Sequence, residues 1–173
     1  MSPSPYDAVA ALERMLGRLR ASSGATRVSA FVYEATTETA VPFRQSVAAT
    51  AEGAAVPELR TAVTLARSPF LAAVVAGRAP VVARADGRRA PDKDLAARGI
   101  RSAHGEPLLR DGEVIGMLTV EPAAAAAPHL LRQVTPKLAV ALADAWTRRS
   151  ESRRLGQAEV LLGLIESASK ARS

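Results

Sequence analysis

The sequence predicts an α+β domain with a long C-terminal helix. The stretch LLRDGEVIGMLTVEP, residues 108–122, holds two apolar runs around Asp111-Gly112, a dipeptide favoured in two-residue β-hairpins. An amphipathic helical pattern precedes the strands, and a much longer one follows them. Strands grouped between terminal helices indicate an α+β fold rather than alternating βαβ units.

The first predicted helix begins at Asp7 and ends at Ala21. Charged residues occupy one side of it, and apolar residues recur on the other at helical spacing: Val9, Leu12, Leu16 and Leu19. Residues 27–50 follow and predict two strands, joined by the polar segment TTET. The first of these strands is apolar on both sides, so we expect it to be covered on both faces.

The middle of the chain predicts short elements. A short helix is expected around residues 57–66, in an otherwise ambiguous stretch. The next helix, SPFLAAVVAG, has clearer ends. Ser68 suits its N-cap, Pro69 its first turn and Gly77 the position just past its end.

A short strand is expected at residues 80–83. The polar stretch 85–94 is a flexible-loop candidate because Gly, Pro and Asp are concentrated in it. A short helix near residues 95–98 should lead into a strand that begins at Ile100 and continues into the hairpin.

The last predicted helix, residues 128–170, exceeds the roughly 8–20 residues of an ordinary globular helix. The polar segment RRSESRR, residues 148–154, separates two apolar stripes in it. The second stripe, residues 155–169, has coiled-coil spacing, but one heptad register does not run through both stripes. We therefore expect a bend or break near residues 149–153 and a partner for the second stripe.

Composition narrows the function. The net charge is +6, but the arginines are dispersed, without helix-turn-helix or zinc-finger spacing, so they predict a solvated basic surface and no nucleic-acid partner. The chain has no cysteine, which excludes disulfides, thiolate metal sites and cysteine nucleophiles. No serine has a recognisable base and acid pattern, and His104 and His129 lie far apart, so neither catalytic nor metal-ligating residues are expected.

The same sequence bears on location. No apolar run approaches the roughly 20 residues that cross a bilayer, so no membrane partner is expected. The N-terminus, MSPSPYDAVAALERM, lacks the basic start and apolar core of a signal peptide. We expect a cytoplasmic protein.

Two segments resemble the GAF family of bacterial sensory domains. VAGRAPVVARAD, residues 75–86, is similar to the end of a family helix and the short strand after it. GIRSAHGEPLLRDGEVIGMLTVEP, residues 99–122, resembles the family's signature strand, Pro-Leu pair, Asp-Gly turn and Gly-containing strand. Helices flank these segments as they do in the family, so the resemblance covers residues 7–146, after a flexible N-terminus at residues 1–6.

The resemblance implies a GAF-like central antiparallel sheet. Helices would pack on one face, and loops with a short helix would enclose a pocket on the other. Residues 147–173 resemble a helical or coiled-coil linker toward an output domain, which suggests a fragment of a larger regulator.

The family's known ligands can be compared with this chain. Bilin attachment and methionine sulfoxide reductase activity use cysteines, which are absent. The Asn-Lys-Phe-Asp-Glu motif of cyclic-nucleotide binders has no equivalent. Haem-binding relatives place a histidine before the signature strand, where this chain has LAARG, so haem is not expected and the cofactor is unknown.

The segment SAHGEPLL departs from the family pattern. His104 and Glu106 stand where relatives usually have apolar residues, and with Ser102 they point to one side of the strand. If that side meets the pocket, the pair could hydrogen-bond a polar ligand, and a nearby carboxylate would raise the histidine pKa. The reading we favour is an edge or interface location where the two side chains satisfy each other.

Six further residues are candidates for the pocket lining. They are Phe31, Tyr33, Phe43, Phe70, Met117 and, near the entrance, Arg78. For the first five we favour a structural role in the core over pocket lining, because the chain has few large aromatic side chains with which to fill its core.

We expect a regulatory sensor module without enzymatic activity. A small molecule in the GAF pocket would shift the packing of dimeric helices, residues 7–21 and 128–170, in a homodimer. The alternative is a dimerisation or protein-interaction module with a vestigial pocket and no small-molecule ligand.

Overall fold

A six-stranded antiparallel sheet forms the centre of the computed structural model, which describes residues 5–48, 59–85, 93–97 and 99–170. The strand order is β3-β2-β1-β6-β5-β4. The strands are β1 (Arg27–Glu34), β2 (Thr39–Val47), β3 (Val63–Thr64), β4 (Val81–Arg84), β5 (Ser102–Arg110) and β6 (Glu113–Glu121).

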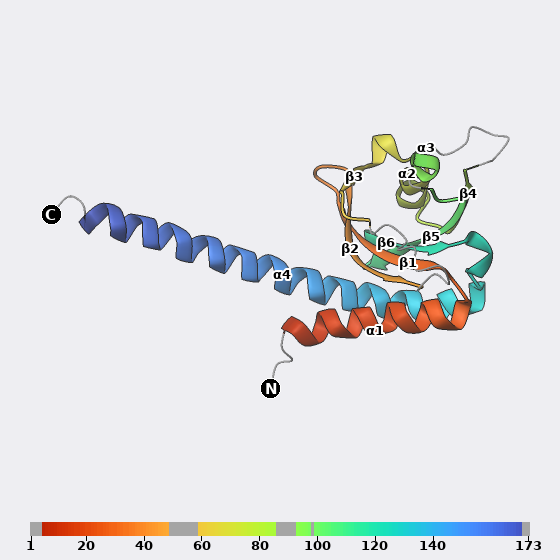
Figure 1. Cartoon of the computed structure of the whole chain (residues 1–173), viewed down its shortest axis with the longest axis horizontal. Helices are drawn as coiled ribbons and strands as arrows, with labels where there is room; N and C mark the ends of the chain where they lie inside the picture. The colour runs from red at the N-terminus through yellow and green to blue at the C-terminus, as the bar shows by residue number, and fades with distance from the viewer. Residues whose placement is uncertain (1–4, 49–58, 86–92, 98, 171–173) are drawn as a thin grey trace.

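Helices cover both faces of the sheet (Figure 1). Helix α1 (Pro5–Ser23) and the first part of α4 (Pro128–Lys170) lie side by side under one face and run in opposite directions. Helices α2 (Pro69–Gly77) and α3 (Lys93–Ala97) lie over the other face. Two 3-10 turns, η1 (Leu65–Arg67) and η2 (Ala123–Ala125), precede α2 and α4. The predicted α+β fold with a long C-terminal helix is confirmed.

The sheet separates two apolar cores. The core on the α1 and α4 side joins the helix stripes to alternate strand residues, and its largest buried side chains are Leu12, Leu16, Val28, Leu108, Leu118, Leu131, Leu138 and Leu142. The core on the α2 side is smaller and contains Phe31, Ala40, Phe70, Leu71, Val74, Leu95, Ile100, Ala103 and Met117. We call these the helix-side core and the inner core.

The central strands are covered on both faces, as their apolar sequences predict. Residues 27–32 of β1 and residues 116–121 of β6 are all buried. The two strands pair along most of their length. Each therefore contributes alternate side chains to both cores.

The local turn signals are largely confirmed. Asp111 and Gly112 have φ of 52° and 80°, as a hairpin turn with two left-handed residues requires. Ser68 caps α2 by accepting a hydrogen bond from the Leu71 amide. One detail differs: Gly77 is the last residue of α2, and Arg78 takes the left-handed conformation after it, with φ of 46°.

Two secondary-structure predictions need correction. Residues 59–66 form no α-helix but contain β3 and the start of the 3-10 turn η1. The rest of the predicted 57–66 helix lies outside the described residues, as does most of the 85–94 loop. Helix α4 continues through residues 149–153 without a break. Its side chains from residue 151 to 161 are exposed, so no neighbouring helix imposes a heptad register that would bend it.

None of the helices in the described part of the chain is long and apolar enough to cross a bilayer.

The close approach of β6 to β1 and α4 makes Gly116 sensitive to any side chain. A Cβ there would meet the backbone oxygen of Phe31 and lie 2.5 Å from Leu142 Cδ2. We expect Gly116→Ala to lower the free energy of unfolding by about 1–3 kcal/mol in urea denaturation. The matched control is Gly156→Ala in α4, where a Cβ meets nothing within 4 Å and helix propensity improves. Equal stability of Gly116→Ala and wild type would contradict this packing.

Candidate ligand-binding site

His104 and Glu106 face the helix layer rather than the inner core. Their antiparallel partners in β6 are Val120 and Leu118, which belong to the helix-side core. Gly105, between them, faces α2 so closely that a Cβ would lie 2.6 Å from a methyl group of Val74. Neighbouring residues of a strand point to opposite faces, so His104 and Glu106 point away from the inner core. They therefore do not line a pocket on that side.

The polar side chains of this strand have partners within the fold. His104 Nε2 lies 2.8 Å from Glu106 Oε1, and the two side chains are only 11% and 14% exposed. Ser102 Oγ accepts a hydrogen bond from the Ala123 amide at 3.1 Å, which ties β5 to η2. The pair thus satisfies its own hydrogen bonds beside the helix layer.

The aromatic candidates divide between the two faces. Phe31, Phe70 and Met117 meet in the inner core, and Tyr33 packs at its margin. Phe43 lies in the helix-side core instead, with its ring centroid 5.7 Å from that of Trp146 in an edge-on arrangement.

The cause of this division is a bulge in β2. The register between β1 and β2 shifts between Ala30 and Phe31, whose partners are Arg44 and Pro42. Phe43 is the unpaired residue between these partners, so the simple alternation of faces fails there.

Arg78 lies outside the inner core. Its guanidinium donates to the Gly112 carbonyl oxygen at 2.9 Å and to Glu113 Oε2 at 3.1 Å. These contacts tie the end of α2 to the β5–β6 turn. Both side chains of the ion pair are more than half exposed.

Four polar residues stand together on the inner face of β1 and β6. Arg27 is opposite Glu121, and Ser29 is opposite Thr119, in the antiparallel register. All four residues are less than a tenth exposed. They continue the face that Phe31 and Met117 occupy further along the same strands, so they form one polar patch beside the inner core. We call these four residues the inner polar cluster.

A buried ion pair forms one half of the inner polar cluster. Arg27 Nε and Nη2 both donate to Glu121 Oε2, at 2.9 and 2.6 Å. The side chains are 3% and 11% exposed. Hydrogen bonds between charged groups are short and strong, and in such a location they hold both side chains in fixed positions.

Two hydroxyl groups form the other half. Ser29 Oγ and Thr119 Oγ1 are buried and have no hydrogen-bond partner among the described residues. A buried polar atom without a partner costs about 1–3 kcal/mol. A partner outside the described residues, such as a water molecule or a ligand group, would remove this cost.

A small cavity opens beside these groups. Its volume is about 10 Å³, close to the space that one water molecule requires. Thr119 and Glu121 supply its polar wall, and apolar residues from the strands, α2 and the segment around α3 supply the rest, among them Phe31, Leu71, Leu95 and Ile100. The cavity thus has a hydroxyl and a carboxylate at one side and an otherwise apolar lining.

The inner polar cluster was missed in the sequence, although a signal exists. Arg27 and Ser29 alternate with apolar residues in one strand, and Thr119 and Glu121 do so in the other. Polar residues at every second position of strands that are otherwise apolar on both sides indicate a buried polar patch. Among the residues that the structure describes, no cluster of His, Cys, Asp or Glu could hold a metal ion.

The sheet, the terminal helices on one face and the cavity under short helices on the other define an α+β domain that encloses a pocket opposite its terminal helices. The family model for the GAF domain matches residues 7–144. The chain belongs to the GAF domain family, and the resemblance seen in its sequence is confirmed.

Solved structures share this fold at low sequence identity. The phycoerythrobilin-bound GAF domain from a cyanobacterial phytochrome has a TM-score of 0.62 at 15% identity, covering 86% of this chain and 90% of that one. The GAF domain from a Coxiella burnetii phosphoenolpyruvate-protein phosphotransferase has a TM-score of 0.60 at 16% identity, covering 83% of this chain and 86% of that one. The free methionine-R-sulfoxide reductase from Neisseria meningitidis has a TM-score of 0.57 at 20% identity, covering 84% of this chain and 81% of that one. A search of curated proteins finds no match.

The buried ion pair gives a stability prediction. Glu121→Ala leaves the charge of Arg27 buried without its carboxylate, so the free energy of unfolding should fall by about 3–5 kcal/mol in urea denaturation. The double variant Arg27→Met/Glu121→Leu should recover much of this loss because it buries no charge. The control Glu113→Ala breaks an exposed ion pair and should cost less than about 1 kcal/mol. Similar losses for the two glutamate variants would argue against a buried pair.

Proposed function

We propose that this GAF domain is a regulatory sensor module that binds a small polar molecule between the sheet and the α2–α3 layer. The observation that carries the proposal is the Thr119 hydroxyl, buried without a described partner in the wall of the inner cavity. Its hydrogen-bonding capacity is not used by the described residues. A ligand that supplies this hydrogen bond would be favoured over an apolar one.

The cavity volume implies a change of shape on binding. A space of about 10 Å³ is far smaller than the roughly 300 Å³ or more of an ordinary ligand pocket. We take this structure as a closed state, from which the ligand would move the α2–α3 layer outward. A ligand shifts such an equilibrium only by its difference in affinity for the closed and open states.

The central strands provide a route from the pocket to α4. Ser29 faces the inner side of β1, whereas its neighbours Val28 and Ala30 pack in the helix-side core with α1 and α4. Gly116 of β6 lies directly against Leu142 of α4. Movement of these strands would therefore change the packing of the terminal helices. Relatives from a phytochrome and a methyl-accepting chemotaxis protein support a role in signalling.

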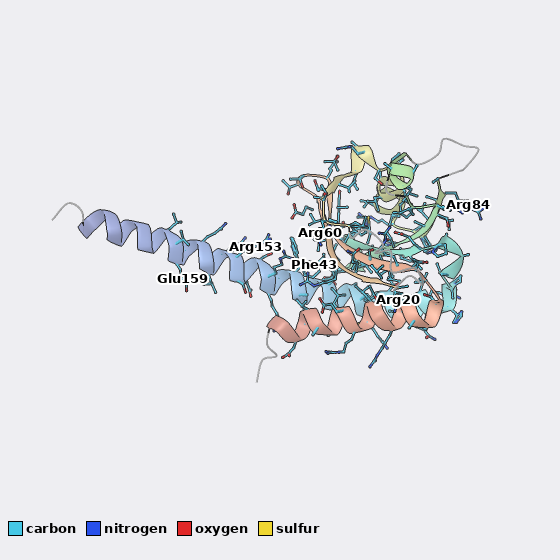
Figure 2. All side chains as sticks on the ribbon, viewed as in Figure 1. Arg20, Phe43, Arg60, Arg84, Arg153 and Glu159 are labelled. Atoms are coloured by element: carbon cyan, nitrogen blue, oxygen red, sulfur yellow. The ribbon has the colours of Figure 1, made fainter. Side chains whose placement is uncertain are left out.

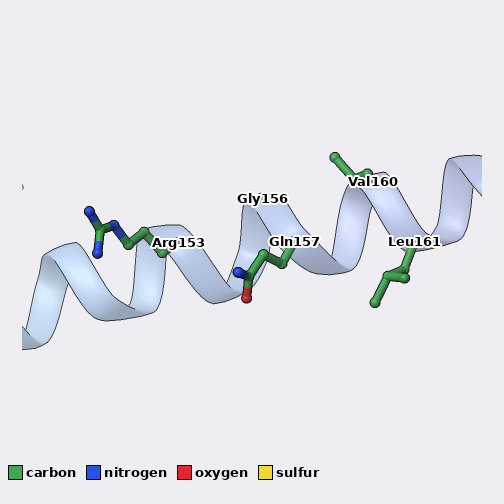
Figure 3. Close-up of a pocket in the computed structure, with 5 residues that line it drawn as sticks. All are labelled: Arg153, Gly156, Gln157, Val160 and Leu161. Atoms are coloured by element: carbon green, nitrogen blue, oxygen red, sulfur yellow. The ribbon is translucent and has the colours of Figure 1, made fainter.

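The second half of α4 supports a homodimer. Leu155, Val160 and Leu161 are 67%, 64% and 60% exposed. A shallow hollow in this region is lined by residues of α4 alone, with Val160 and Leu161 projecting from opposite sides of the ribbon (Figure 3). Exposed apolar residues on a helix without neighbours favour association, and we propose a parallel pair with a second copy of the chain.

A specific observation favours the alternative function. The same small cavity would suit an interaction module whose pocket is vestigial and whose helices only dimerise or bind a protein. Ligand binding separates the two functions, because a molecule that binds only the native state raises the melting temperature.

The Thr119 hydroxyl gives the test of the sensor function. Thr119→Val removes an unpartnered buried hydroxyl, so it should raise the free energy of unfolding of the free protein by about 1 kcal/mol. The same variant should lose the melting-temperature shift of any metabolite without a phosphate group that is found in a thermal-shift screen of the wild type. Thr135→Val is the control, because the Thr135 hydroxyl donates to the Leu131 carbonyl and its loss should not stabilise. A screen without hits, or hits that Thr119→Val leaves unchanged, would favour the alternative.

The dimer is tested through Leu155. Leu155→Glu removes an apolar side chain from each protomer, worth about 1.5–3 kcal/mol per copy, so the dimer Kd should rise about 100-fold or more in analytical ultracentrifugation. Val82→Glu, at an exposed apolar position on edge strand β4, should leave the Kd unchanged. A wild-type chain that is monomeric at 100 μM would contradict the dimer.

A single spin label then reports on transmission in the same dimer. The chain has no cysteine, so Gln157→Cys introduces a unique thiol on the exposed part of α4. A ligand found in the screen should change the label-to-label distance across the dimer. An unchanged distance with bound ligand would rule out this route of signalling.

A further inference from the structure

A second hollow, of about 380 Å³, lies where the edge of β2 meets α1 and α4. Strand β3 pairs only with Thr39 and Ala40 within the described part of the chain, so it does not cover the rest of this edge. Except for Leu59, the hollow shares no lining residue with the inner cavity. Figure 2 shows Phe43 beside α4 and Arg60 on the same side of the domain.

Three arginines from three parts of the chain line the hollow. Arg44 comes from β2, Arg60 from the segment before β3, and Arg149 from α4. The only carboxylate among the described lining residues is that of Glu13 in α1. The lining therefore carries three positive charges and one negative charge, which favours an anion.

Two of the guanidinium groups lie against the aromatic ring of Phe43. The Cζ atoms of Arg44 and Arg149 lie 4.8 and 5.5 Å from the centroid of its ring. The face of an aromatic ring attracts cations, and Trp146 packs edge-on against the same ring from α4. Two like charges therefore lie against one aromatic ring at the border of the core, near enough for Arg44 to affect the electrostatics of Arg149.

The guanidinium groups of Arg44 and Arg149 are incompletely paired by the described residues. Arg44 Nε lies 2.9 Å from Glu13 Oε1, but the contact lacks the alignment of a hydrogen bond, and this buried nitrogen has no other described acceptor. Arg149 pairs with no carboxylate among the described residues. Burial, and then the charges of Arg153 and Arg44, lower the pKa of Arg149 below its usual value.

We propose that this hollow binds the phosphate group of a small anion. The planar guanidinium group of Arg149 can donate two parallel hydrogen bonds to phosphate oxygens. Arg44 Nη1 already donates to the Phe43 carbonyl oxygen at 2.6 Å and Arg44 Nε faces Glu13, so Arg44 would contribute its remaining N–H groups and its charge. Ser29 of the inner polar cluster also lines this hollow, whereas Thr119 lines only the inner cavity, so Thr119 separates this site from the proposed sensor pocket.

The position of the site gives it a regulatory consequence. Arg149 belongs to the last turn of α4 that packs on the domain, because every side chain from Glu151 to Leu161 is exposed. A phosphate group held by Arg44 and Arg149 joins this turn to β2. The bound anion therefore fixes the direction in which α4 leaves the domain.

Binding can be measured with orthophosphate and with glycerol 2-phosphate, each compared with chloride at equal ionic strength. At tenfold excess over Kd, the melting temperature should rise by roughly 3–5 °C. Trp146 is the only tryptophan of the chain and lies against Phe43, so its fluorescence should change with the same titration midpoint. Orthophosphate as the tighter ligand assigns the site to free phosphate, and the ester as the tighter ligand assigns it to a phosphorylated small molecule.

Variants of Arg149 test the site. Arg149→Gln should fold, because it relieves repulsion with Arg44 and Arg153, and it should weaken both ligands about tenfold or more. Arg149→Lys keeps the charge without the planar fork and should weaken them less. Arg132→Gln, an exposed position on the same helix, is the matched control and should bind as the wild type does.

Two outcomes would overturn the proposal. One is the absence of any response to either ligand at 10 mM; the other is a response that Arg149→Gln retains in full. Thr119→Val should keep the phosphate response, since Thr119 does not line this hollow. The Thr119 variant therefore tests ligand binding in the inner cavity, and the Arg149 variants test phosphate binding in the hollow, so the two proposals can be rejected separately.

Discussion

The pairing of β1 with β6 is the constraint on which the rest of the structure depends. Both strands are buried on both faces, so every residue in their paired stretch has a neighbour above or below the sheet. Their apolar side chains hold α1 and α4 on one side and the α2 layer on the other. Strand β6 lies so close to β1 and α4 that only glycine fits at position 116. Such a strand pair cannot shift toward one layer without changing its contacts with the other.

The sequence predicted the parts of the fold that depend on short-range chemistry. The Asp111-Gly112 turn, the Ser68 cap and the apolar pattern of the central strands require only local preferences, and each is present. Family resemblance supplied the arrangement of these elements. The extent of α4 was also predicted, but its continuity was not, because a change of heptad register bends a helix only where a partner helix packs against it.

The candidate site was harder to predict because side-chain direction depends on register. His104 and Glu106 share one face of β5, but the sequence did not reveal which face; the small residue between them, Gly105, lies against α2 and sets the direction. The face on which Phe43 lies could not be predicted because the bulge in its own strand, β2, cannot be read from alternation. The inner polar cluster combines residues about 90 positions apart, and only the pairing of their strands brings them together.

The part of α4 that extends beyond the sheet gives small internal movements a large reach (Figure 1). From Glu151 to the helix end at Lys170 it comprises 20 residues, or about 30 Å at 1.5 Å per residue. A rotation of about 10° at its base would carry the far end sideways by about 5 Å, close to the rise of one helical turn. A small rotation at the last turn that packs on the domain is therefore amplified into a large displacement at the far end of the helix (Figure 1). An adjustment of side chains too small to alter the sheet would therefore displace the far end of the helix by about one helical turn.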